Sequence, residues 1–302
     1  MAVDYHNPVM LDECLEGLNI KPGGVYVDVT FGGGGHSKAI VEKLEGGKLY
    51  GFDQDADAQS NASTIDKSSF TLIASNFRYL KRYLKMYRVT EVDGILADLG
   101  VSSYQIDNPE RGFSTRFDAE LDMRMDQSGK LTAKNVINEY SEAALHQMFG
   151  MYGEVRNAKT LAAAIVSART NQPIHTVNEL KAVLERFAKR GKEFRYFAQV
   201  FQAIRIEVNE ELKALEEMLE QSAEILKKEG RLVVMSYHSL EDRLVKNFIN
   251  KGDFRGNEEK DFYGNVIKPL VAINRKPIEA SEKEVKENNR ARSAKLRIAE
   301  KK

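Results

Sequence analysis

The chain has 302 residues, 42% of them hydrophobic, and its 45 basic and 45 acidic residues give a net charge of zero. This length suffices for one large domain or two ordinary ones. A net charge of zero disfavours a uniformly basic nucleic-acid-binding protein. Either the substrate is not a long polyanion, or the positive charge is clustered in one part of the chain. No apolar run approaches the roughly 18 residues of a membrane span, and the first residues lack a signal-peptide pattern. The single cysteine, Cys14, excludes an intrachain disulfide and a cysteine-built metal site. We therefore expect a cytoplasmic protein without a membrane partner.

A glycine-rich turn between a strand and a helix is the main feature of the first part of the chain. A helix is predicted over residues 9–18, with Cys14 as a buried apolar side chain. Residues 25–31 are β-branched and aromatic, which predicts a strand. Four glycines follow at 32–35, and a helical pattern begins at His36. Glycines permit a tight turn and a close approach of the backbone to a ligand, and a helix start aims N–H groups at it.

The residues around this turn distinguish two classes of ligand. A dinucleotide motif has a third glycine where this chain has Ser37. Asp28, inside the strand, suits a ligand with an ammonium and a sulfonium better than a pyrophosphate, because opposite charges attract. The next predicted strand, residues 48–52, ends in Asp53, near the position of a ribose-binding acid. We therefore favour S-adenosylmethionine (SAM) over NAD(P) as the ligand.

Strands and helices alternate as far as residue 98. After the second strand the pattern predicts a polar helix, a strand, a helix and a fourth strand, over residues 56–65, 70–74, 78–88 and 92–97. Such alternation indicates a parallel, doubly wound sheet, in which ligands bind at the carboxyl ends of the strands. The candidate ligand residues at these ends are Gly32 to His36, Asp53, Phe77 and Asp98.

The sheet pattern then stops. Residues 107–209 contain helical periodicity at 143–149, 159–168, 177–187 and 195–208, and no convincing strand. We expect an α/β domain formed by residues 1–106 and 210–302, with an inserted all-helical domain at residues 107–209. The second part of the α/β domain is predicted as an amphipathic helix at 210–228, a strand at 232–236 that ends beside His238, a helix at 240–250, short strands within 266–274 and a basic tail.

Several stretches together resemble one family, the bacterial methyltransferases called RsmH or MraW. They run nearly end to end and are found at residues 7–11, 28–32, 34–37, 98–103 with Gln105, 111–114, 121–126, 201–206 with Val208 and Asn209, 238–243 and 290–297. This chain departs from the family's usual residues at Tyr104, Tyr237, Asn289 and residues 195–200, which bears on local loop shape and RNA contacts.

The resemblance implies a Rossmann-like SAM-dependent methyltransferase domain with an inserted helical substrate-recognition domain. It implies methylation of the exocyclic N4 amine of a cytosine in small-subunit (16S) ribosomal RNA. The near-zero net charge favours the assembled 30S particle as the substrate, and we expect a monomer or homodimer. The resemblance also implies SAM contacts at Gly34, Gly35, His36, Asp53, Phe77, Asp98 and Gln105.

A cytosine amine is a poor nucleophile because its lone pair is delocalised, so an acceptor for its N–H would help. Asp98 is the candidate acceptor, and it can instead bind the methionine end of SAM. His238 is a candidate for accepting the released proton or contacting the base, with a structural histidine as the alternative. Methylation at C5 would need a thiolate nucleophile, and Cys14 lies outside every strand-end motif.

An RNA target must be splayed out of its stack to reach such a pocket. The side chains that could hold phosphates or stack on bases are Arg111, Phe113, Arg124, Arg290, Arg292 and Arg297, each of which can also be a solvated surface residue. Other hypotheses are a methyltransferase for a small molecule or protein, an NAD(P)-dependent enzyme, which Ser37 and Asp28 disfavour, and a non-enzymatic ribosome-assembly factor.

Overall fold

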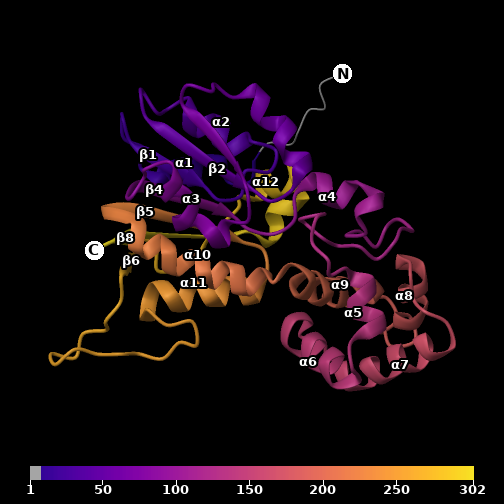
Figure 1. The fold of residues 1–302 in the computed structure, drawn as a ribbon. Coiled ribbons are helices and arrows are strands. Elements are labelled where there is room, and N and C mark those ends of the chain that lie inside the picture. The colour runs from indigo at the N-terminus through magenta and orange to yellow at the C-terminus, as the bar shows by residue number, and fades with distance from the viewer. Residues whose placement is uncertain (1–7) are drawn as a thin grey trace. The chain divides into compact units, whose positions relative to one another are not determined.

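The computed structural model of the protein describes residues 8–302 and divides the chain into two compact units. The sheet unit comprises the chain up to Gly100 together with Leu212–Lys302, and the helical unit comprises Val101–Glu211 (Figure 1). The expected insert, residues 107–209, lies inside the helical unit. Asn7, the first residue of the first family motif, lies outside the described residues.

The sheet unit is built on one mixed sheet with the strand order β3-β2-β1-β4-β5-β8-β6, and β7 pairs with β8. Neighbouring strands among β1 to β5 are parallel, whereas β8 is antiparallel to β5, β6 and β7. The strand bounds are β1 Val25–Asp28, β2 Lys48–Asp53, β3 Phe70–Ala74, β4 Val92–Asp98, β5 Leu226–Ser236, β6 Leu270–Ala272, β7 Ile278–Glu279 and β8 Lys295–Lys301. The chain runs from β1 through β2 to β3 on one side and resumes at β4 on the other. The switch point of this doubly wound sheet is therefore between β1 and β4.

Buried side chains that alternate along the strands supply two separate cores. Val27, Ile95 and Val234 belong to one cluster, whereas Tyr26 and Leu96 belong to the other, because successive strand side chains point to opposite faces. The first cluster is completed by α3 (Leu80–Met86), α10 (Glu211–Ile225) and α11 (Ser239–Lys251). The second is completed by α1 (Leu11–Leu18), α2 (Gly35–Val41) and α12 (Glu282–Glu287). The sheet unit is thus a three-layer α/β fold.

The helical unit has its own apolar core. Its elements are α4 (Ser103–Asp107), η3 (Pro109–Arg111), α5 (Ala133–Glu139), α6 (Glu142–Gly153), α7 (Ala158–Asn171), α8 (Val177–Leu184) and α9 (Glu193–Asn209). Leu145, Phe149, Leu161, Leu180 and Ile204 lie in its core. In the part of the chain that the structure describes, its only β pairing is an isolated bridge. No helix among the described residues is long and apolar enough to cross a membrane.

Several predicted elements differ from the structure. The expected polar helix at residues 56–65 is a 3-10 helix, η1 (Ala56–Thr64); a second 3-10 turn, η2 (Phe77–Tyr79), precedes α3. The helix expected to reach residue 228 ends at Ile225, and β5 begins at once. Val92 pairs with Leu226 before the register shifts to Gly94 and Arg231.

The end of the expected basic tail is strand β8, which follows η4 (Asn289–Ser293). The side chains of Leu296 and Ile298 alternate along β8 and are buried, as in a strand. The charged residues between and around them mask this pattern in the sequence. Arg297 lies between Leu296 and Ile298 and is buried too. Its Nε donates to Asp242 Oδ1 at 2.7 Å and its Nη2 to Asp242 Oδ2 at 3.2 Å. The hypothesis that Arg297 holds RNA phosphate is therefore wrong, since its guanidinium pairs α11 with β8.

We expect Arg297→Met to lower the free energy of unfolding by about 3 kcal/mol, because it leaves the Asp242 carboxylate unpaired in a largely buried position. The side chains of Arg297 and Asp242 are 7% and 14% exposed. Urea denaturation checks this value. Arg292→Met, at an exposed position five residues earlier in the chain, is the matched control and should change stability by less than about 0.5 kcal/mol. Equal losses in the two variants would contradict the structural role of the pair.

Candidate functional site

The turn after β1 is organised by the buried carboxylate of Asp28. Ser37 Oγ donates to its Oδ2 at 2.7 Å, and Thr30 N donates to its Oδ1 at 3.1 Å. Asp28 is 1% exposed, and this burial raises its pKa. Because Asp28 is buried and both of its oxygens accept from the protein, its surroundings do not favour a direct contact with a ligand, and that contact stays a prediction. Asp28 instead ties the strand to the start of α2, and Ser37 acts as its partner at the place of the missing third glycine.

The glycines of the turn are required by its packing. Gly34 has φ +78°, and a Cβ there would lie 3.0 Å from the Phe31 ring. A Cβ on Gly35 would lie 2.6 Å from Pro8 Cγ. His36, next in the chain, is buried and its Nε2 donates to the Val9 carbonyl at 3.0 Å. Gly34, Gly35 and His36 therefore fix the path of the backbone between β1 and α2, and direct SAM contacts from them stay a prediction.

Asp53 closes the same turn from the end of β2. Its Oδ2 accepts from Gly32 N at 2.7 Å, and its Oδ1 accepts from Asp55 N at 2.8 Å. Burial raises the pKa of Asp53 to about 6, although both backbone N–H groups favour its charged form. Phe77, also expected at the site, begins η2 after β3 and packs partly buried against the core formed with α3, α10 and α11.

Asp98, at the end of β4, is held from two neighbouring strands. Its backbone N donates to Thr30 Oγ1 at 2.6 Å, and Tyr237 donates its hydroxyl proton to Asp98 Oδ1 at 2.7 Å. The other oxygen, Oδ2, lies 3.8 Å from His36 Nδ1. Burial raises the pKa of Asp98 to about 6, and His36 and Tyr237 oppose that rise. The side chain remains 24% exposed, so it combines a perturbed carboxyl with access to solvent.

Tyr237 and Thr30 were missed as site residues by the sequence reasoning. Tyr237 follows β5 directly, and Thr30 follows β1 by two residues. The strand-end rule that selected Asp53 and Asp98 applies equally to both positions. Neither side chain is charged, so neither stands out in the sequence as a candidate ligand residue.

His238 caps α11. Its Nδ1 accepts from Glu241 N at 3.4 Å, and Glu241 Oε2 accepts from His238 N at 3.3 Å. Because Nδ1 accepts, the neutral ring carries its proton on Nε2, which lies 3.2 Å from Glu241 Oε1. Nδ1 is therefore used by the helix cap, whereas Nε2 makes no hydrogen bond in the part of the chain that the structure describes. A role for His238 in proton transfer stays a prediction.

Cys14 is a buried thiol, as expected. Its side chain is 0% exposed, and burial together with the nearby Asp98 carboxylate raises its pKa well above 9.0. A thiol that holds its proton so firmly is a poor nucleophile. Methylation through a covalent cysteine adduct is therefore disfavoured on chemistry as well as on position.

Gln105 belongs to the helical unit. It is buried, and its Oε1 accepts from Ser102 N at 3.0 Å while Ser102 Oγ accepts from Gln105 N at 3.2 Å. This reciprocal pair is a capping box that starts α4. A contact between Gln105 and SAM stays a prediction.

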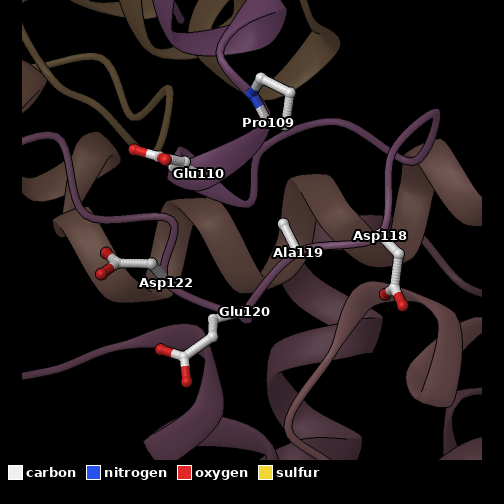
Figure 2. A pocket seen from close by; sticks show the side chains of 6 residues that line it. All are labelled: Pro109, Glu110, Asp118, Ala119, Glu120 and Asp122. Carbon is white, nitrogen blue, oxygen red and sulfur yellow. The ribbon is translucent and has the colours of Figure 1, made fainter.

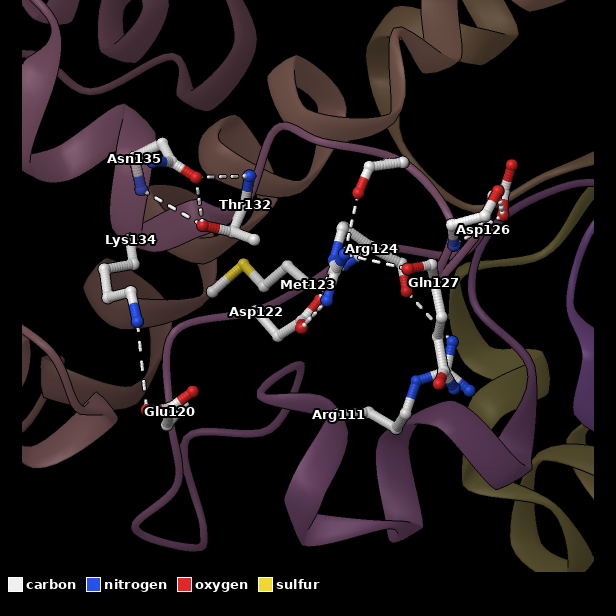
Figure 3. Close-up of polar contacts among 12 residues, drawn as sticks. Arg111, Glu120, Asp122, Met123, Arg124, Asp126, Gln127, Thr132, Lys134 and Asn135 are labelled. Atoms are coloured by element: carbon white, nitrogen blue, oxygen red, sulfur yellow. Dashed lines mark hydrogen bonds and ion pairs between the residues drawn. The ribbon is translucent and has the colours of Figure 1, made fainter.

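Two arginines expected at an RNA surface stabilise a loop of the helical unit instead (Figure 3). Arg111 is buried and its Nη2 donates to the carbonyls of Arg124 and Met125 at 2.9 and 3.2 Å. Arg124 Nη2 donates to Asp122 Oδ2 at 2.6 Å, and its Nη1 donates to the Gly129 carbonyl at 2.7 Å. Phe113 packs partly buried against the core of this unit. These contacts explain the residues structurally without RNA.

The helical unit also has a pocket of about 340 Å³ (Figure 2). It is lined by Pro109, Glu110, Asp118, Ala119, Glu120 and Asp122. Three of these carboxylates are engaged, because Asp118 Oδ1 accepts from Asn178 N at 3.1 Å, Asp122 pairs with Arg124, and Glu120 Oε1 lies 3.8 Å from Lys134 Nζ. An acidic lining repels phosphate, so this pocket is unsuited to hold an RNA backbone.

Comparison with known proteins assigns the family. Residues 4–302 match the MraW methylase family. A protein of Cytophaga hutchinsonii named ribosomal RNA small subunit methyltransferase H is 62% identical over 296 residues, which cover 98% of this chain and 99% of that protein. A protein of the same name from Flavobacterium johnsoniae is 58% identical over 301 residues, which cover 99% of each chain. The chain belongs to the MraW methylase family.

The raised pKa of Asp98 predicts a stability difference that depends on pH. Because the pKa of Asp98 rises from 3.8 to about 6 on folding, the folded state binds more protons than the unfolded state between these values. The stability that Asp98 contributes therefore falls as pH rises from 4 to 6. We expect Asp98→Asn, which does not titrate, to become more stable relative to the wild type across this window. Denaturation at pH 4, 5, 6 and 7 measures this difference.

Asp66→Asn is the control for this window. Hydrogen bonds from Ser68 lower the pKa of Asp66 below 3.8 in the folded state, so its stability contribution changes mainly below about pH 4, and the difference between the wild type and this variant should be nearly constant from pH 5 to pH 7. A stability difference for Asp98→Asn that does not change with pH would show that the Asp98 pKa is ordinary.

Proposed function

We propose that this chain transfers a methyl group from SAM to the exocyclic N4 amine of a cytosine in small-subunit (16S) ribosomal RNA. One observation carries the proposal. In a chain of the MraW family, the glycine turn, Asp53 and Asp98 end the parallel strands β1, β2 and β4 at the switch point of the sheet, where doubly wound folds bind ligands.

The residues at these strand ends fit SAM. Each oxygen of Asp53 accepts one backbone N–H, and a carboxylate oxygen has a second lone pair for a ribose hydroxyl. Phe77, partly buried, supplies an apolar wall for the adenine. Gly34, Gly35 and His36 hold the turn that passes beside the ligand, and Gln105 of the helical unit is the remaining proposed contact.

When bound, SAM supplies a methyl group activated by a positive sulfur. The chain's part is to align the acceptor amine with that methyl, and such positioning is worth about 7–11 kcal/mol. Asp98 Oδ2 accepts a hydrogen bond from the amine N–H, which turns the nitrogen lone pair toward the methyl carbon. As the N–C bond forms and the C–S bond breaks, the amine loses a proton. A carboxylate whose pKa is about 6 is a suitable first acceptor for it.

The proposed substrate is the assembled 30S particle in the cytoplasm, and the helical unit recognises it. Zero net charge supports this, because a protein without a basic excess gains little from the counterion release that drives binding to naked RNA. Of the side chains considered for RNA contact, Arg290 and Arg292 remain as proposals. The protein acts as a monomer or homodimer.

The first test is transfer of labelled methyl from SAM to 30S particles that lack the modification, followed by mass spectrometry of the nucleosides. We expect label on N4 of cytosine, and more of it on the particle than on naked 16S RNA. Label on another nucleoside would support methyltransferase activity but contradict the cytosine N4 amine as the acceptor. Equal or better activity on naked RNA would overturn the particle as substrate. No transfer despite SAM binding would bring forward a small molecule or a protein as the acceptor.

Two substitutions separate the proposed roles of Asp98 and His238. Asp98→Asn should lower the single-turnover rate by about 100-fold or more, since the amine loses a charged acceptor, and calorimetry will measure its SAM affinity separately.

His238→Asn removes the imidazole but keeps a good N-cap residue. We expect its rate to stay within about twofold of wild type, because Nδ1 serves the helix cap and Nε2 lies 3.2 Å from Glu241 Oε1 of the same helix. A His238→Asn rate reduced by the roughly 100-fold typical of a lost acid or base would place His238 in the chemistry.

A further inference from the structure

Tyr237 has a contact that the proposed reaction leaves unused. It follows β5, whose Met235 lies opposite Asp98 in the β4–β5 register. Its hydroxyl donates to Asp98 Oδ1 at 2.7 Å, and its backbone N donates to Glu241 Oε2 at 2.9 Å. The ring is therefore fixed at its tip and at its base, which makes the hydroxyl a defined donor rather than a mobile one.

We propose that Tyr237 is a positioning residue that holds the Asp98 carboxylate so that Oδ2, which lies 3.8 Å from His36 Nδ1, accepts from the substrate amine. The inference rests on the proposed function and adds a residue to it. Thr30 Oγ1 fixes the backbone of Asp98 at 2.6 Å, and Tyr237 fixes one oxygen of its side chain. These two contacts orient the carboxylate of Asp98 so that its second oxygen, Oδ2, faces His36.

The charges around Asp98 give this hydrogen bond a measurable consequence. Asp28 from β1 and Glu241 from α11 raise the pKa of Asp98, as burial does, whereas His36 from α2 and Tyr237 lower it. The Cys14 thiol of α1 is neutral in this range, since its pKa is raised well above 9.0. Burial and Asp98 also raise the pKa of Tyr237 well above its ordinary value, so the phenol stays a donor. Loss of the hydroxyl removes a donor to the charged carboxylate and raises the pKa of Asp98.

The direction of the effect on activity follows. The amine needs an ionised Asp98, so the rate falls as pH drops through the pKa of Asp98. In Tyr237→Phe we expect this acid limb of the single-turnover profile to move up by about one pH unit. The rate should fall more at pH 6 than at pH 8, while SAM affinity at pH 8 stays within about twofold.

Tyr26→Phe is the matched control. Tyr26 is a buried tyrosine on β1 of the same unit, and its hydroxyl accepts from Lys21 N at 2.8 Å. This variant loses one buried hydroxyl without touching Asp98, so its pH profile should match the wild type. A fluorinated tyrosine at position 237 is a stronger donor of nearly the same shape, and it should move the acid limb to lower pH. An unmoved limb in Tyr237→Phe, or equal movement in the Tyr26→Phe control, would overturn the proposal.

A measurement without substrate separates this inference from the proposed function. In protein labelled with ¹³C at aspartate carboxyls, the Asp98 signal is assigned by its loss in Asp98→Asn and titrated by NMR. We expect an Asp98 pKa that is higher in Tyr237→Phe and lower with fluorotyrosine. Absence of methyl transfer by the wild type would remove the proposed function alone. Identical Asp98 titrations in all three proteins would remove the role of Tyr237 even if methyl transfer is found.

Discussion

The candidate site depends on one buried carboxylate, Asp28. It accepts from Ser37 Oγ on α2 and from Thr30 N after β1, so a single group joins the strand, the glycine turn and the helix. Thr30 then passes the constraint on, because its Oγ1 accepts from the backbone of Asp98. A hydrogen bond to a buried carboxylate is worth more than one between neutral groups. The positions of β1, α2 and the end of β4 are thereby coupled through two short side chains.

The same carboxylate acts on the site through its field. Asp28 raises the pKa of both Asp53 and Asp98, in addition to the larger effect of burial. Both carboxyls therefore have a pKa of about 6, so a small change in their surroundings shifts their charge near that pH. A ligand with positive charge favours their ionised forms, and a pyrophosphate opposes them. The preference for a cationic ligand that the sequence analysis based on Asp28 therefore has electrostatic support that does not require a direct contact between Asp28 and the ligand.

The sequence predicted the parallel part of the sheet well because its central strands are buried on both faces and read as apolar runs, as in Ile95 and Leu96 of β4. It also predicted Asp53 and Asp98 at strand ends, since that inference needs only the strand boundaries. It failed at β8, where Arg297 breaks the apolar pattern and is balanced by Asp242, far away in the chain. It also missed Tyr237, whose contact with Asp98 depends on the pairing of β4 with β5. Long-range partners of polar side chains are set by tertiary structure, and local patterning contains no signal for them.

The arginines show why basic residues are poor evidence for an RNA surface in a chain of zero net charge. Arg111 bonds two carbonyls of a loop, Arg124 pairs with Asp122, and Arg297 pairs with Asp242. Each guanidinium offers several donors in a fixed plane, which suits a bent backbone or a carboxylate as well as a phosphate. We therefore expect a substitution at any of these positions to lower stability, whether or not the side chain contacts RNA. Loss of activity there identifies an RNA contact only when the stability of the variant, measured in the same buffer, equals that of the wild type.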